Sequence, residues 1–252
     1  MSRNSLVALA LLTLAATAQA NDAPVAAAAP DFTLSANLSL TSQYRYRGLM
    51  QSDNKPAVQG GFDLAHRSGF YLGNWNSSIS WLGDSNPDVS APVEMDFYGG
   101  YKGNVADGVP VDLGVLQYYY PGDFPSGYTS PDTTELYAGI GYGPIMFKYS
   151  IAMTNLFGFA DSKYSQYFDL SANVDTGVWG LTLNAHAGRQ MVKNVDKGSY
   201  TDWKLGLTKD FGQGLSVSLA YLDTNADRAV YTNTRGRDMG RATGVLSLTK
   251  TF

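Results

Sequence analysis

The chain has 252 residues, no Cys and only 16% charged residues, with 18 Lys and Arg against 22 Asp and Glu. The formal net charge of −4 argues against a broad basic face for nucleic acid, and the lack of Cys excludes disulfides, thiolate nucleophiles and Cys-ligated zinc. His66 and His186 are the only histidines, so a three-His metal site is also excluded, and we expect neither a metal nor a cofactor.

The first twenty residues have the pattern of a signal peptide. Arg3 gives a positive start, residues 6–16 form an apolar run, and Ala18 and Ala20 are the small residues that signal peptidase accepts. This run is shorter than the ~20 residues that span a bilayer, which favours cleavage after Ala20 over a membrane anchor. We therefore expect an exported bacterial envelope protein, with a signal peptide at 1–20 and a flexible periplasmic leader at 21–31.

From residue 32 onward the sequence alternates with a period of two, which is typical of strands with one apolar and one polar face. In residues 32–41 every even position is apolar and every odd position is polar. Further segments of strand character lie at 57–66, 70–81, 93–102, 111–120, 134–142, 145–153, 164–174, 178–189, 200–209, 215–222 and 243–252. The pattern predicts about twelve strands, with ten or fourteen as alternatives if a hairpin is merged or split.

The links between these segments alternate in length. Long polar links lie around 48–56, 82–92, 121–132, 154–163, 190–199 and 223–240, whereas the others are short, apart from 103–108. Long loops at one end and tight turns at the other are typical of an outer-membrane barrel with both termini in the periplasm. We therefore predict an all-β fold over residues 32–252, a closed antiparallel transmembrane β-barrel in the bacterial outer membrane.

A soluble β-sandwich or periplasmic barrel is the alternative to this fold. The polar face of the predicted strands is too rich in Ser, Thr, Asn, Asp and Tyr for a packed interior. All ten Pro lie in the leader, in links or at strand starts, where no sheet hydrogen bond is lost. Closing the sheet would satisfy every backbone donor in lipid, so the membrane barrel is favoured.

Aromatic residues near the predicted strand ends suit the interfacial girdle of a membrane barrel. Those on the apolar parity include Phe32, Tyr44, Tyr46, Trp81, Tyr119, Tyr142, Tyr164 and Phe252. A terminal aromatic residue after an amphipathic strand is also what barrel-assembly machinery is expected to recognise. Phe252 is therefore the predicted assembly signal.

Residues 41–63, followed by residues 68–75, resemble the N-terminal signature of the TorF family of porins. The residues that carry this signature are Arg47, Gly48, Ser52, Asp53, Pro56, Gly60 and Gly61. Leu49 and Met50 depart from it, because an Ile-Ser type pair is expected there. The resemblance implies a proteobacterial outer-membrane channel, and it implies neither a particular solute nor any binding residue.

Strand parity also predicts which charged side chains line the barrel interior. The predicted pore-lining residues are Arg45, Arg47, Asp63, Glu94, Asp96, Lys102, Asp112, Glu135, Lys148, Asp169, Asp202 and Lys204. A hydrated interior suits these charges, because an Arg or Lys facing lipid near the midplane costs ~2–4 kcal/mol. We expect Arg45 or Arg47 to pair with Asp63 across the first hairpin. In the alternative interpretation, the charges pair off and only hold the barrel in shape.

These features predict a porin-like channel for passive diffusion of small hydrophilic solutes or ions, with a narrow lumen and a mild cation preference. The alternatives are a structural or adhesin-type barrel with a plugged lumen and, least favoured, a barrel lipid hydrolase. Because His186 falls on the inward parity, away from lipid, we expect no enzyme activity.

The remaining expected partners are outer-membrane lipid, lipopolysaccharide and the barrel-assembly machinery. Arg228, Arg235, Arg237 and Arg241 crowd the last loop, where they could bind lipopolysaccharide phosphates or fold inward as a constriction. The acidic residues beside them favour a third interpretation, a solvated loop of mixed charge.

Overall fold

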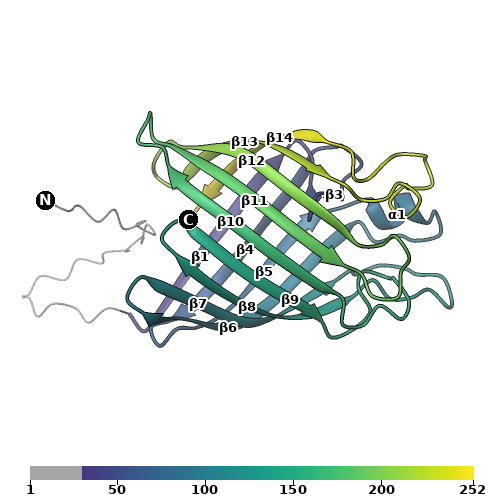
Figure 1. Cartoon of the computed structure of the whole chain (residues 1–252), viewed down its shortest axis with the longest axis horizontal. Helices are drawn as coiled ribbons and strands as arrows, with labels where there is room; N and C mark the ends of the chain where they lie inside the picture. Colours follow the sequence, from purple (N-terminus) through teal and green to yellow (C-terminus); the bar gives the residue numbers. More distant parts are fainter. Residues whose placement is uncertain (1–29) are drawn as a thin grey trace, which may run out of the picture.

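The structure, a computed structural model, describes residues 30–252 and is a closed antiparallel β-barrel of twelve strands (Figure 1). The barrel strands are β1 (Phe32–Thr41), β4 (Ala57–His66), β5 (Phe70–Ser78), β6 (Val93–Ala106), β7 (Val109–Tyr119), β8 (Thr133–Tyr142), β9 (Ile145–Ala152), β10 (Gln166–Asp175), β11 (Leu181–Met191), β12 (Tyr200–Asp210), β13 (Leu215–Thr224) and β14 (Thr243–Thr251). The predicted fold and strand number are confirmed. The predicted signal peptide and all but the last two residues of the leader lie outside the described residues.

The barrel closes between its first and last strands. β1 pairs with β4 from Phe32↔His66 onward, and on its other edge with β14, where Asn37 lies opposite Thr251. The backbone N–H of Phe252 donates to the carbonyl of Ala36 at 2.8 Å and extends this seam. Each of the twelve barrel strands is paired on both sides, so within residues 30–252 the wall leaves no sheet edge to be satisfied in lipid.

The two faces of the wall follow the alternation of the sequence. Leu34 and Leu38 are 70% and 53% exposed, and Leu246 and Leu248 of the neighbouring strand are exposed on the same outer face. The polar residues that alternate with them face the interior, where the Ser39 and Thr249 hydroxyls lie 2.6 Å apart across the seam between β1 and β14. The apolar outer surface suits acyl chains, whereas the polar surface is enclosed.

The two ends of the barrel differ as the link lengths predict (Figure 1). Tight turns at 67–69, 107–108, 143–144, 176–180 and 211–214 lie at the end that holds the C-terminus. Longer loops lie at the opposite end, where Figure 1 places the short strand β3 (Leu49–Met50) and the helix α1 (Trp81–Ser85). Within residues 30–252, no helix has the length and apolar character needed to cross a membrane.

Some predicted element boundaries are wrong. The link at 103–108 is shorter than expected, because β6 continues to Ala106 through a register shift near Asn104. The first strand stops at Thr41, so Tyr44 and Tyr46 belong to the first loop and not to a lipid-facing strand. Trp81 is likewise wrong as a girdle residue, because it begins α1 and packs inside the loop end.

The other predicted girdle aromatics are exposed, as an interfacial belt requires. This group is Phe32, Tyr119, Tyr142, Tyr164 and Phe252.

Candidate functional site in the barrel interior

The first loop, residues 42–56, turns inward at Arg47 and Gly48 instead of continuing the wall. A two-residue strand β2 (Arg45–Tyr46) pairs with β3, and both Arg47 and Gly48 at the turn have positive φ, 46° and 77°. A Cβ on Gly48 would lie 2.8 Å from the Cβ of Asp202 and 3.2 Å from that of Thr224. Only glycine combines this backbone conformation with so close an approach to β12 and β13.

The Arg47 side chain reaches the opposite wall. Its guanidinium donates to Glu135 Oε2 on β8 and to Gln190 Oε1 on β11, both at 2.7 Å, and lies 4.1 Å from the ring centre of Tyr167 on β10. The Arg47 and Glu135 side chains are only 6% and 2% exposed. Burial alone would lower the pKa of Arg47, but Glu135 holds it well above the usual value, so Arg47 stays charged.

Aromatic residues surround this ion pair. The Tyr46 hydroxyl hydrogen-bonds that of Tyr118 on β7, and Tyr118 in turn donates to Glu135 Oε2 at 3.2 Å. The rings of Tyr46 and Tyr118 meet edge to face, and Phe157 of the loop 153–165 packs against both. The first loop is therefore fixed to the three strands β7, β8 and β11 and to a second loop.

A second cluster of charges lies on the other side of Arg47. His186 on β11 lies between two carboxylates, with Nδ1 3.3 Å from Asp169 and Nε2 2.8 Å from Asp202. The Tyr167 hydroxyl donates to the same Asp202 carboxylate at 3.0 Å. Sequence parity placed His186 inward but gave no sign of these partners, because they come from two neighbouring strands.

Two further predicted residues, Glu94 and Asp96, are buried side by side on β6. The Tyr44 hydroxyl donates to Glu94 Oε1 at 3.4 Å. The second Glu94 oxygen and one oxygen of Asp96 have no hydrogen-bond partner among the described residues. Burial of two carboxylates so close together leaves this part of the wall rich in acceptors.

The predicted pairing of Arg45 or Arg47 with Asp63 is wrong, because the first strand ends before either arginine. Arg45 donates to Gln43, to Asn54 and to the carbonyl of Met239 instead. Asp63 accepts a hydrogen bond from Tyr98 on β6 at 2.8 Å.

The remaining predicted charges lie at different depths. Asp112 on β7 accepts from Tyr71 at 2.6 Å, and Lys102 lies 3.9 Å from it near the turn end, with a side chain 62% exposed. Lys148 on β9 lies over the Tyr137 ring, and Lys204 on β12 is half-buried.

The signature residues outside Arg47 and Gly48 shape the first loop and the strand after it. Asp53, 2% exposed, accepts from Arg235 and Arg237 of the last loop, each at 2.9 Å, and Arg235 also bridges to Asp84 of α1 at 2.9 Å. Ser52 accepts from the backbone of Tyr44 at 2.8 Å.

Glycine is required at two signature positions of β4, which follows Pro56. A Cβ at Gly60 or Gly61 would lie under 3 Å from backbone of the adjacent strands. A single sequence reveals neither the ion pairs of Asp53 nor the close backbone contacts of Gly60 and Gly61, because the partners lie in other strands and loops.

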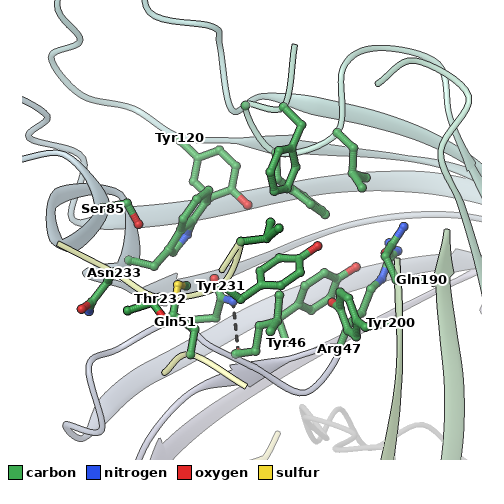
Figure 2. A pocket seen from close by; sticks show the side chains of 18 of the residues that line it. Tyr46, Arg47, Gln51, Ser85, Tyr120, Gln190, Tyr200, Tyr231, Thr232 and Asn233 are labelled. Carbon is green, nitrogen blue, oxygen red and sulfur yellow. Dashed lines mark hydrogen bonds between the residues drawn. The ribbon is translucent and has the colours of Figure 1, made fainter. Parts of the chain in front are cut away.

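Two cavities meet at the inward turn of the first loop. The outer cavity, about 410 Å³, lies among the loops, and the inner cavity, about 210 Å³, lies in the lumen beside Lys148, Asp169, His186, Asp202 and Lys204. Tyr46 and Arg47 line both cavities. Figure 2 shows the outer one, with Tyr46, Arg47 and Gln51 of the first loop and Tyr231, Thr232 and Asn233 of the last loop gathered around it.

Solved structures with this fold include two small porins. The KdgM porin in complex with disordered oligogalacturonate matches with a TM-score of 0.55 and 7% identity, over 86% of this chain and 98% of that one. The NanC porin, in a rhombohedral crystal form, matches with a TM-score of 0.52 and 11% identity, over 87% of this chain and 99% of that one. At such low identity the likeness shows the fold alone, a closed antiparallel barrel of twelve strands.

Comparison by sequence gives the family. No curated protein matches the chain at a significant level. A family model described as "Bacterial protein of unknown function (Gcw_chp)" matches residues 25–252, which include all the barrel strands. The chain therefore belongs to the Gcw_chp family of bacterial proteins.

Proposed function

We propose that this protein is a porin-like channel of the bacterial outer membrane that admits small hydrophilic solutes or ions. The observation that carries the proposal is the two-faced wall, apolar outside and polar inside, closed around cavities that hold charged side chains. The fold shared with KdgM and NanC supports this assignment. The resemblance of residues 41–75 to the TorF signature supports the finer proposal that the chain is a TorF-type porin.

The predicted charged residues are proposed to line the solute path. Seven carboxylates and five cations make up this set, and Arg47 crosses the lumen where the two cavities meet. The excess of carboxylates favours cations over anions at the wall. Oligogalacturonate, the polyanion in one KdgM structure, is accordingly not proposed as the solute here.

A barrel plugged by its first loop is the second candidate. The buried Arg47–Glu135 ion pair favours it, because the pair ties the loop across the interior. Conductance separates the two candidates, because a channel passes current at least intermittently, whereas a plugged barrel passes none.

The test is planar-bilayer recording of the refolded chain in a salt gradient. We expect a measurable current whose reversal potential shows a mild cation preference, and a smaller preference in the triple variant Glu94→Gln, Asp96→Asn and Asp112→Asn. Asp107→Asn, in the exposed turn at 107–108, is the control and should leave the reversal potential unchanged. A preference that survives the triple substitution would refute the lumen assignment, and no current at all would favour the plugged barrel.

Membrane partners are proposed from the two ends of the barrel. An open cavity of about 560 Å³ at the last loop is lined by Arg228, Arg237 and Arg241, which suit the phosphates of lipopolysaccharide. Phe252 at the opposite end is proposed as the signal for the barrel-assembly machinery. Comparing the binding of phosphate-bearing and dephosphorylated lipopolysaccharide to the refolded barrel would test the lipopolysaccharide site. Measuring the assembly of a chain that lacks Phe252 would test the assembly signal.

A further inference from the structure

We propose that the outer cavity is a binding site for an uncharged, flat solute that carries oxygen acceptors on its edge, such as a neutral sugar or a nucleoside. The inference rests on the proposed channel function and names the class of solute that the loop end would select. Four features carry it: the aromatic walls, the absence of free charge, two unpaired donors and the size of the cavity.

Aromatic rings from separate loops form the walls. Trp81 of α1 and Tyr120 of the loop 120–132 meet edge to face at 5.6 Å between ring centres. On the other side, Tyr231 of the last loop packs edge to face against Phe159 at 6.1 Å and against Tyr200 at 5.2 Å. Rings held in this way give rigid apolar surfaces against which a flat solute can pack at little entropic cost.

The charge of this cavity differs from that of the lumen below it. Among the described residues that line it, Arg47 is the only charged one, and its guanidinium is already paired with Glu135. The inner cavity carries Arg45, Lys148, Lys204 and the Asp169–His186–Asp202 cluster. An ion would lose hydration in the outer cavity without gaining a free counter-charge, so the site favours neutral solutes.

Two N–H groups in the wall have no acceptor. The Trp81 Nε1 and the Asn233 Nδ2 are buried without a hydrogen-bond partner among the described residues. Both residues line the cavity, and Asn233 is only 5% exposed. A buried donor left unpaired costs about 1–3 kcal/mol. The Asn233 amide is fixed, because its Oδ1 accepts from the backbone N–H groups of Arg235 and Arg237 at 3.0 Å, so the donor that a solute oxygen would satisfy is Trp81 Nε1.

The volume sets the size of the solute. At about 410 Å³, the cavity lies within the ~300–1,000 Å³ range of small-molecule sites. Flat apolar faces with hydroxyl or carbonyl oxygens at their edges are common to sugar rings and nucleoside bases. Neutral sugars and nucleosides would therefore be recognised by the same contacts, and the experiment distinguishes between them.

The test is isothermal titration calorimetry of the intact refolded chain with maltose, uridine and galacturonate as probes. We expect saturable binding of maltose or uridine, weaker binding of the anionic galacturonate, and a loss of affinity of about tenfold in Trp81→Phe, which keeps a ring but removes the donor. The control is Trp179→Phe, because Trp179 is 82% exposed in a turn at the other end of the barrel. If Trp81→Phe fails to fold, Tyr120→Leu takes its place. It removes a ring from the cavity wall and should also weaken binding.

The outcomes separate this inference from the channel proposal, because the titration needs no current. Equal affinity of the parent chain and of the folded Trp81→Phe or Tyr120→Leu variant would overturn the inference, as would tighter binding of galacturonate or no binding of any probe. Binding of maltose or uridine by a barrel that passes no current would support the site and refute the channel. Current through a barrel that binds none of the probes would do the reverse.

Discussion

Replacing Arg47 with Ala tests the ion pair that joins the first loop to the wall. The substitution removes both 2.7 Å hydrogen bonds of the guanidinium and its contact with the Tyr167 ring. It also leaves Glu135, whose side chain is 2% exposed, without its counter-charge. Breaking one partner of a buried pair costs about 3–5 kcal/mol, so we expect a loss of this size in the free energy of unfolding.

Urea unfolding of the refolded barrel, followed by tryptophan fluorescence, measures that loss. Arg228→Ala is a matched control, because the Arg228 side chain is 76% exposed and its pair with Asp238 should contribute no more than ~1 kcal/mol. Adding Glu135→Gln to Arg47→Ala removes the unpaired charge and should recover part of the stability. With the single Glu135→Gln variant, these measurements give the coupling between the two side chains.

Conductance provides a second, independent readout of the same variant. Arg47 lines both the 410 Å³ and the 210 Å³ cavities, so its truncation should join them and increase the single-channel current. A folded Arg47→Ala barrel with unchanged stability and unchanged current would refute the view that this residue closes the loop against the wall.

Three other substitutions have expected outcomes. Leu205→Arg, at a position 57% exposed on the outer face, should destabilise the barrel by ~2–4 kcal/mol in urea titrations. Gly188→Ala should cost about 1–3 kcal/mol in the same assay, because its Cβ would lie 2.0 Å from the Tyr167 hydroxyl. Asp53→Asn should release Arg235 and Arg237 of the last loop from the first loop, and limited proteolysis should then cleave the last loop faster. Unchanged titrations or cleavage rates would contradict these assignments.

The barrel wall could be predicted from the sequence because lipid constrains both the backbone and the side chains. A closed sheet and a period of two are the consequences, and both are visible in residues 32–41 and 243–251. The inward turn of the first loop could not be predicted from this period. Gln43, Tyr44, Arg45 and Tyr46 continue the alternation past the end of β1, so the pattern alone extends the strand.

The interior contacts were hidden for a different reason. Arg47 and Glu135 are 88 residues apart and meet only because the closed wall brings β8 opposite the first loop. Parity gives the face of a side chain but not its partner across the lumen. The one local signal was the glycine after Arg47, which indicates a backbone turn within an otherwise strand-like stretch.

Asn74 and Asn76 on β5 are an exception to the two-faced wall. Their parity is opposite to that of Trp75, which packs inward against Tyr44, so both amides are on the outer side. Asn74 is nevertheless only 8% exposed, because it donates to the carbonyl of Asp96 and accepts from Asn76. The Asn74 amide thus makes its hydrogen bonds within the sheet, whereas the Asn76 Oδ1 has no hydrogen-bond partner among the described residues.

The central claim is that the polar face encloses the conducting path while the apolar face contacts lipid. Because the chain has no Cys, single cysteines at two adjacent positions of β9 test it directly: Lys148→Cys beside the inner cavity, and Phe147→Cys, 40% exposed on the outer face. We predict that a membrane-impermeant, sulfonate-bearing thiol reagent alters the current through the Lys148→Cys barrel and leaves that through Phe147→Cys unchanged. A reagent effect on the current through the Phe147→Cys barrel alone would contradict the claim, as would the absence of current through either barrel.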